Sequence, residues 1–322
     1  PIMLSPSQTI LDPITVVDSL SGSEIMRLAM ERISENHPSE PVSMDVFYRE
    51  RQLMDGAYVS LVEAALTVYD EYNLKRRKSP LRTKVRVDEL RRSLVYEHPF
   101  NSWLQQDNLM MHSWNLNPIP YASKALAKSA KKSEFNRNGM TKVLGKSAFI
   151  IESDNANFWK TTYFIQTGTY AIVRVEENFD EALDGPKHWE MRGDSLLLDV
   201  YFKKRHVTVD FKEINNKYHL TYIQLNASHD YYQEGTFLAQ FGIIQDFVVN
   251  DINWSIPTVI VRNEAAMIGK SLLSKDYPYN EKFWENYNVL QETPLEKKLV
   301  EDLEKRANSL DQQFISNQKT QK

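Results

Sequence analysis

The chain has 322 residues, a formal net charge of -4 and 25% charged residues, and this ordinary balance indicates neither a nucleic-acid protein nor a polybasic membrane binder. It contains no cysteine, which excludes a disulfide, a thiolate nucleophile and a cysteine-ligated metal site. Only 10 glycines beside 16 tyrosines and 14 phenylalanines favour aromatic-faced strands over a phosphate-binding α/β protein. Its apolar runs are far shorter than the roughly 18 residues that a spanning helix needs, so no transmembrane segment is predicted.

The first predicted element is a short helix that begins after Ser21. Ser21 and Glu24 have the spacing of a capping box, in which each side chain bonds to the backbone of the other residue. The sequence Asn36-His37-Pro38 ends the helix. Its predicted buried stripe consists of Ile25, Leu28, Ala29 and Ile33.

A β-hairpin is predicted over residues 43–70, with a three-residue loop at Met54-Asp55-Gly56 and Gly56 in the left-handed conformation. This register pairs even-numbered with even-numbered residues. One face then carries Met44, Val46, Tyr48, Val62, Ala64 and Leu66 and is largely apolar. The other face carries Phe47, Arg49, Arg51, Leu61 and Glu63.

Arg49 and Glu63 are the charged residues of this hairpin that the pattern singles out. The predicted register places them diagonally, roughly 7 Å apart between backbones, within reach of two long side chains. We interpret them as a structural ion pair that steadies the wall of a sheet. The alternative is a half-buried charge pair inside a cavity, with a role in chemistry.

The remaining elements form a long antiparallel meander with a helical end. Residues 98–132 lack alternation and are predicted as helices joined by loops. Strands are predicted over 84–90, 159–166, 169–176, 195–202, 205–213, 218–226 and 237–255. A C-terminal helix begins at Thr293-Pro294-Leu295-Glu296, and a frayed tail follows over 311–322. The helix is expected to dock on the sheet through Leu295, Leu299, Leu303 and Ala307.

Two motifs resemble known sites but have the wrong spacing or setting. In GMTKVLGKS, five residues separate Gly139 from Gly145, whereas a phosphate-binding loop has four. His37 and Glu40 match the His-x-x-Glu pattern of zinc enzymes, yet they follow a helix exit, and we predict a solvated linker there.

Two further clusters of charged residues have plain interpretations. His206, Asp210 and His219 are too far apart for one ion, because His206 and Asp210 are separated by roughly 13 Å along a strand. The basic run over residues 75–92 is interpreted as a charged sheet edge or a solvated loop. Contacts to a nucleic-acid backbone or to lipid phosphates remain its alternatives. No metal or other cofactor is expected.

Several stretches of this chain resemble one family of envelope proteins. They are IMLSPSQTILDPITVV at 2–17, ISENHPSEPVSMDVFYRE at 33–50, EAALTVYDEY at 63–72, and YPYNEKFWENYNVLQETPLEKKLVEDL at 277–303. In these stretches the chain is similar to the carboxypeptidase-like regulatory domain-containing proteins of Bacteroidota. The family's name refers to a non-catalytic β-sandwich module, so the resemblance carries over no catalytic residue.

The resemblance implies a domain organisation and a fold. Residues 1–18 would be the last strand and linker of an upstream β-sandwich, and residues 19–310 a half-open barrel like that of the periplasmic lipoprotein carrier LolA. The predicted fold class is therefore α+β, with a curved antiparallel sheet packed on helices and with N- and C-terminal helices. The family also implies a location in the periplasm or at the outer membrane.

The leading functional hypothesis is a non-enzymatic cell-envelope protein. Its half-open barrel would bind an apolar ligand, such as a lipid acyl chain, or would act as an accessory surface for an outer-membrane protein. The alternative is a hydrolase with an acidic or histidine-containing site in the concavity of the sheet. A nucleic-acid partner is not expected, and its affinity would fall steeply with salt.

Overall fold

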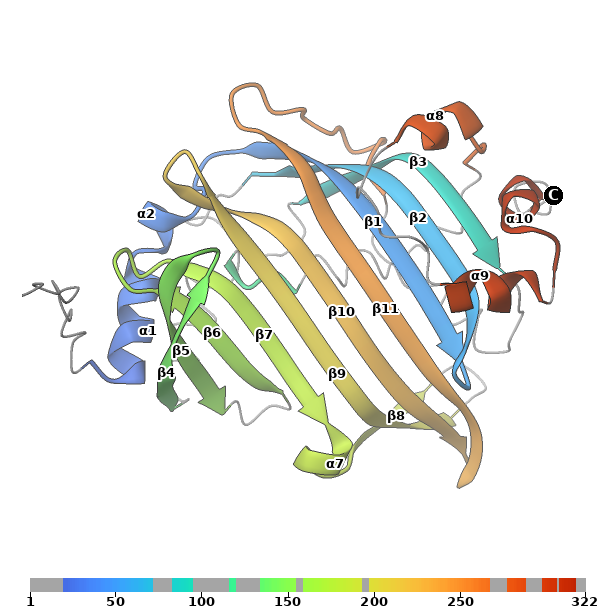
Figure 1. Cartoon of the computed structure of the whole chain (residues 1–322), viewed down its shortest axis with the longest axis horizontal. Coiled ribbons are helices and arrows are strands. Elements are labelled where there is room, and N and C mark those ends of the chain that lie inside the picture. Colours follow the sequence, from blue (N-terminus) through green and yellow to red (C-terminus); the bar gives the residue numbers. More distant parts are fainter. Residues whose placement is uncertain are drawn as a thin grey trace, which may run out of the picture.

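A computed structural model of the chain describes residues 20–71, 83–94, 116–119, 134–154, 159–192, 197–266, 277–287, 297–305 and 307–316. One large curved sheet dominates this structure (Figure 1). Its strands follow the order β3-β2-β1-β11-β10-β9-β7-β6-β5-β4, and β8 pairs with β9 beside β7. All the strand pairs are antiparallel. The predicted fold class, a curved antiparallel sheet packed on helices, is confirmed.

The strands vary in length from 6 to 18 residues. They are β1 (Val42–Met54), β2 (Ala57–Asp70), β3 (Lys84–Leu94), β4 (Phe135–Val143), β5 (Lys146–Asp154), β6 (Lys160–Gln166), β7 (Ile172–Asp180), β8 (Lys187–Arg192), β9 (Leu197–Ile214), β10 (Lys217–Gln233) and β11 (Thr236–Asn253). The helices are α1 (Gly22–Glu31), α2 (Ile33–Asn36), α7 (Glu181–Asp184), α8 (Glu281–Asn286), α9 (Lys297–Glu304) and α10 (Leu310–Ser316).

Helices α1 and α2 pack at one end of the face of the sheet that we call the inner face (Figure 1). The capping box of Ser21 and Glu24 is present, as predicted. Ile25, Ala29 and Ile33 join a buried cluster that draws apolar residues from β1 to β7 and from β9 to β11. Gly22 lies so close to β4 that an added Cβ would be 2.3 Å from the Phe135 carbonyl oxygen, which only glycine avoids. The even-numbered apolar face predicted for the first hairpin forms part of this cluster.

The C-terminal helices pack against the opposite, outer face of the sheet. Leu299 and Leu303 of α9 contact Tyr58 and Leu61 of β2 in a second apolar cluster, as the predicted stripe requires. Ala307, in contrast, is exposed. The tail predicted to fray from residue 311 instead includes α10, because Leu310 and Phe314 also enter this cluster.

Four two-residue turns connect consecutive strands of the meander. Both residues of each turn have positive φ angles, the geometry that matches the twist of the flanking strands. The turns are Asp55-Gly56, Leu144-Gly145, Asn215-Asn216 and Glu234-Gly235. The three-residue loop predicted at 54–56 is therefore wrong. A bulge at Gln52/Leu53 restores the even-to-even pairing, so the predicted faces hold.

The structure differs from the sequence-based expectations at three other places. The segments 195–202 and 205–213 form one continuous strand, β9, whose pairing with β10 is interrupted only by bulges. The segment GMTKVLGKS contains the end of β4 and a hairpin turn, in which Gly145 serves the tight reversal, whereas Gly139 lies at an irregularity in the pairing of β4 with β5. Strand β8 lies in a region for which no strand was predicted.

Some predictions fall on residues outside the described ranges. These are the strand and linker at 1–18, most of the helical region at 98–132, the basic residues at 75–82 and the helix start at 293–296. The remaining part of the basic run lies on β3, which is an edge strand of the sheet, as one interpretation expects. Among the described helices, none has both the length and the apolar character to cross a membrane.

Candidate functional site

Arg49 and Glu63 lie directly opposite each other on β1 and β2, and not diagonally as the sequence predicts. Arg49 Nε is 2.6 Å from one oxygen of Glu63, and Arg91 Nε of β3 is 2.6 Å from the other. The Glu63 side chain has no exposed surface. Both carboxylate oxygens therefore accept charge-assisted bonds, which is the condition under which a buried charge is tolerated.

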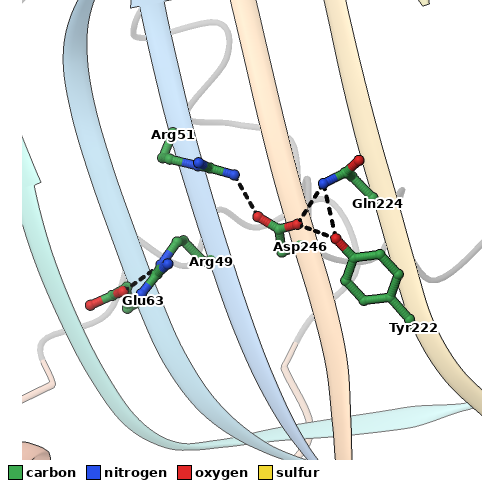
Figure 2. A network of polar contacts seen from close by, with 6 residues as sticks. All are labelled: Arg49, Arg51, Glu63, Tyr222, Gln224 and Asp246. Atoms are coloured by element: carbon green, nitrogen blue, oxygen red, sulfur yellow. Dashed lines mark hydrogen bonds and ion pairs between the residues drawn. The ribbon is translucent and has the colours of Figure 1, made fainter. Parts of the chain in front are cut away.

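The contacts of Arg49, Glu63 and Arg91 form the first part of a polar band on the outer face of the sheet. A second group of residues extends this band across β1, β11 and β10 (Figure 2). Arg51 of β1 lies 2.6 Å from Asp246 Oδ2 of β11. The other oxygen of Asp246 accepts hydrogen bonds from the Tyr222 hydroxyl at 2.7 Å and the Gln224 amide at 3.0 Å, both from β10. Each carboxylate oxygen in the band is thus engaged. The arrangement joins β1, β11 and β10 through paired side chains.

Glu50 is a buried acidic residue on the inner face that the sequence prediction missed. Its carboxylate accepts hydrogen bonds from the Tyr48 hydroxyl at 2.5 Å, from Gln52 at 2.7 Å and from Gln245 at 3.0 Å. Burial raises the pKa of Glu50, and these three donors oppose part of that rise. The sequence did contain a signal for this burial. Glu50 is even-numbered and follows Tyr48 on the strand face that was predicted to be apolar.

His37 is buried rather than lying in the solvated linker that the sequence predicts. Its Nδ1 lies 2.9 Å from the Tyr218 carbonyl oxygen, and its ring meets Phe211 edge-on at 5.3 Å. Burial lowers the pKa of His37 to about 3, so the imidazole is neutral at physiological pH. Glu40, the other residue of the His-x-x-Glu motif, is exposed, so the two side chains lie in different environments.

The second histidine cluster is also dispersed, as its spacing predicts. Asp210 forms a two-point ion pair with Arg174 at 2.5 and 2.9 Å, and His206 Nδ1 lies 2.5 Å from the Asn178 side-chain oxygen. His219 instead neighbours the Trp254 ring at 6.1 Å. The described residues contain no group of His, Asp and Glu side chains able to hold a metal ion.

A pocket of about 550 Å³ lies where the β4–β5 turn meets the β9–β10 turn. We call it the turn-end pocket. Two strands, β7 and β6, separate β9 from β5 in the sheet order, so the pocket lies where the curved sheet brings distant strands together. Its lining consists of Val143, Leu144, Lys146, Val173, Phe211, Lys212, Glu213, Asn215, Asn216 and Tyr218.

The walls of the turn-end pocket combine apolar and polar side chains. Phe211 and Val173 are buried parts of the inner core, with 1% and 4% of their surface exposed. Lys146 of β5 forms an ion pair with Glu213 of β9 and thereby joins the two turns across the pocket. This contact lowers the pKa of Glu213 and raises the pKa of Lys146. Both groups are therefore charged at neutral pH.

Leu144 at the mouth of the pocket was not singled out by sequence reasoning. It is 70% exposed and has a φ of 48°, a left-handed conformation that costs most side chains about 1–2 kcal/mol. The equivalent first positions of the other three turns hold Asp55, Asn215 and Glu234. An apolar residue at this position is thus the exception among the turns, and it borders the pocket.

The sequence matches no protein-family model and no curated protein. Three similar solved structures come from bacterial proteins, and the matches cover 74% to 77% of this chain. A DUF1329 family protein from Desulfovibrio piger is 10% identical over 74% of this chain and 95% of that chain, with a TM-score of 0.31. A putative outer membrane lipoprotein-sorting protein domain from Vibrio parahaemolyticus is 13% identical over 74% and 94% of the two chains, with a TM-score of 0.29.

The third is the LolA superfamily protein NE2245 from Nitrosomonas europaea, which is 10% identical over 77% of this chain and 99% of that chain, with a TM-score of 0.27. At identities of 13% or less and TM-scores of 0.31 or less, these similarities establish no shared function.

Proposed function

We propose that this protein binds an apolar ligand of the acyl-chain type in the turn-end pocket and that it is not an enzyme. The observation that carries the proposal is Leu144. Leu144 is 70% exposed, so it buries little apolar surface, and its left-handed conformation costs free energy. Neither property stabilises the fold. Strained residues of this kind are frequent where a protein clamps a ligand.

The dimensions and lining of the pocket support the same function. A volume of about 550 Å³ lies within the 300–1,000 Å³ that is usual for small-molecule sites. Leu144, Val143, Val173 and Phe211 supply apolar surface on several sides. A ligand chain that covers the Leu144 side chain would remove it from water, worth up to about 1.5–3 kcal/mol for one fully buried leucine.

The rival hydrolase has less support among the described residues. A general acid or base needs an oxygen or nitrogen within reach of a substrate. The carboxylates of Glu50, Glu63 and Asp246 are instead occupied by hydrogen bonds within the sheet. Glu213 does line the pocket, but its partner Lys146 holds it as an ionised carboxylate.

We also propose that the protein works in the cell envelope, in the periplasm or at the outer membrane, where an outer-membrane protein is a candidate partner. The support is the resemblance of residues 33–50 and 277–303 to envelope proteins of Bacteroidota. Fractionation of the native cells tests this location, with recovery in the periplasmic or outer-membrane fraction as the expected result. Recovery with cytosolic markers would contradict it.

Native mass spectrometry of protein purified without detergent tests the binding function. We expect an added mass in the range of an acyl lipid, or, after dodecanoic acid is added, a one-to-one complex. Val173→Phe should abolish both the added mass and the complex with dodecanoic acid, because the larger phenyl ring fills the pocket. Leu183→Phe is the matched control, because Leu183 on α7 is 86% exposed and lies outside the lining.

Val173 is also a core residue, so its substitution could disturb folding. Leu144→Asn is therefore the second variant, because Leu144 is exposed. A complex that persists unchanged in both pocket variants would contradict the proposed site. Absence of any complex with the wild-type protein, even with dodecanoic acid in excess, would contradict the proposed function.

A further inference from the structure

The polar wall of the turn-end pocket carries an excess of positive charge. Lys146 and Lys212 line it together with one carboxylate, that of Glu213. Glu213 is already paired with Lys146, whereas Lys212 is exposed and has no ion-pair partner in the described part of the chain. The protein as a whole has a net charge of -4, so this local excess has the opposite sign.

Tyr218 gives a second indication of a polar ligand group. The residue is 5% exposed and lines the pocket, and its hydroxyl makes no well-formed hydrogen bond in the described structure. Lys146 and Glu213 nevertheless lie close enough to influence its pKa, and the Lys146 ammonium is 5.8 Å from the centre of its ring. A buried hydroxyl whose contacts with Lys146 and Glu213 are not well aligned retains capacity for a further partner.

The hydroxyl of Tyr218 is available as a donor at neutral pH. Burial raises the pKa of Tyr218 above its ordinary value, so the proton remains on the oxygen. The neighbouring Asn215 and Asn216 at the β9–β10 turn add amide groups to the same wall. An acceptor that carries negative charge would complement these donors and the unpaired lysine.

We infer that the turn-end pocket selects amphiphiles with an anionic head group, a carboxylate or a phosphate, which Tyr218 and Lys212 bind while the chain lies against Leu144 and Phe211. This inference rests on the proposed function, since it concerns the same pocket. It adds the chemical class of the head group, which the apolar walls alone do not specify.

Isothermal titration calorimetry with four ligands of equal chain length tests the inference. The ligands are dodecanoic acid, dodecyl phosphate, dodecanol and dodecylamine, each used below its aggregation concentration. We expect the acid and the phosphate to bind about tenfold or more tightly than the alcohol, as for a hydrogen bond to a charged group, and the amine to bind weakest. The tighter of the two anions identifies the preferred head group.

Two variants assign the selectivity to named residues. Tyr218→Phe and Lys212→Gln should each weaken binding of the anions by about tenfold and leave binding of dodecanol unchanged. Lys204→Gln is the matched control for charge, because the Lys204 side chain is 72% exposed and lies outside the pocket lining. Circular dichroism of each variant verifies that the fold is retained.

The outcomes separate this inference from the proposed function. If the alcohol binds as tightly as the anions, or if neither variant changes the preference, the head-group inference is wrong while the apolar site stands. If none of the four ligands binds the wild-type protein, the proposed function fails as well.

Discussion

Glu63 is the residue whose contacts lead us to expect the largest effect of a charge substitution on the free energy of unfolding. Its buried carboxylate holds two guanidinium groups, those of Arg49 and Arg91. Removing one partner from such a group leaves buried charge without compensation. The sequence pattern identified Arg49 and Glu63 because both are charged on one strand face. It did not identify Arg91, whose approach depends on how β3 pairs with β2.

Glu63→Gln should lower the free energy of unfolding by about 3–5 kcal/mol, measured by urea denaturation at neutral pH. The matched control is Glu31→Gln, which breaks an exposed pair with Arg27 on α1 and should cost about 0.5 kcal/mol or less. A loss below about 1 kcal/mol for Glu63→Gln would contradict a structural role for the ion pair.

The burial of His37 makes the free energy of unfolding depend on pH. The folded protein binds a proton there only near pH 3, whereas the unfolded chain binds it near the ordinary value of 6.5. Stability contributed by neutral His37 is therefore complete above pH 6.5 and is lost as the pH falls towards 3. His229, whose pKa is lowered to about 4 by burial, acts in the same direction.

His37→Phe should make the free energy of unfolding less dependent on pH between about 4 and 6, by up to about 1.4 kcal/mol per pH unit. His229 remains in this variant and leaves a residual dependence. His188→Phe, which replaces an exposed histidine, is the matched control for the change from imidazole to phenyl ring. Equal slopes for wild type and His37→Phe would show that His37 does not stay neutral in the folded state.

The burial of His37 was not predictable from its neighbours in sequence. A proline after a helix exit is typical of an exposed connection. Here α2 is held to the sheet by contacts with distant segments, since Lys217 Nζ bonds to the Ser34 and Glu35 carbonyl oxygens and Asn36 bonds to Thr169. Glu50 was missed for a related reason, because its donor Gln245 lies on β11.

At the scale of elements, two of the four hairpin turns were predicted in place, and the loop geometry predicted for the first of them was wrong. Asp55-Gly56 and Asn215-Asn216 are strong local turn signals, and both occur at turns. The bulge that follows Asp55-Gly56 depends on cross-strand packing, which a local signal does not contain. The turn at Leu144 was hidden, because leucine is unfavourable in the left-handed conformation that the turn imposes.

Leu144→Asn should therefore have opposite effects on stability and on binding. Asparagine tolerates a positive φ angle, so the free energy of unfolding should rise by about 1 kcal/mol. The loss of apolar surface at the pocket mouth should weaken dodecanoic acid binding by several-fold. Thermal denaturation and calorimetry measure the two effects. Leu183→Asn, which is exposed on α7, should change neither appreciably.

An increase in stability together with unchanged affinity would separate Leu144 from the ligand. In that case its strain would have no functional explanation in the turn-end pocket. Weaker binding accompanied by a loss of stability would point instead to a disturbed hairpin.

At the scale of the whole molecule, alternation and turn signals were sufficient for an antiparallel meander, whereas the curved half-open sheet was expected from the family resemblance. The antiparallel order of β4 to β7 and of β9 to β11 follows from short connections, each of which joins neighbours in the sheet. Curvature accumulates from the twist of many strands and is not written in any one segment. The turn-end pocket depends on that curvature, because Lys146 and Glu213 come from strands that are not adjacent.

The central claim is that an acyl ligand occupies the turn-end pocket. A photoactivatable fatty acid, cross-linked to the wild-type protein and mapped by peptide mass spectrometry, tests it most directly. We predict cross-links within residues 143–146 and 211–218 that excess dodecanoic acid suppresses and that Val173→Phe abolishes. Cross-links that concentrate elsewhere, or that dodecanoic acid does not suppress, would contradict it.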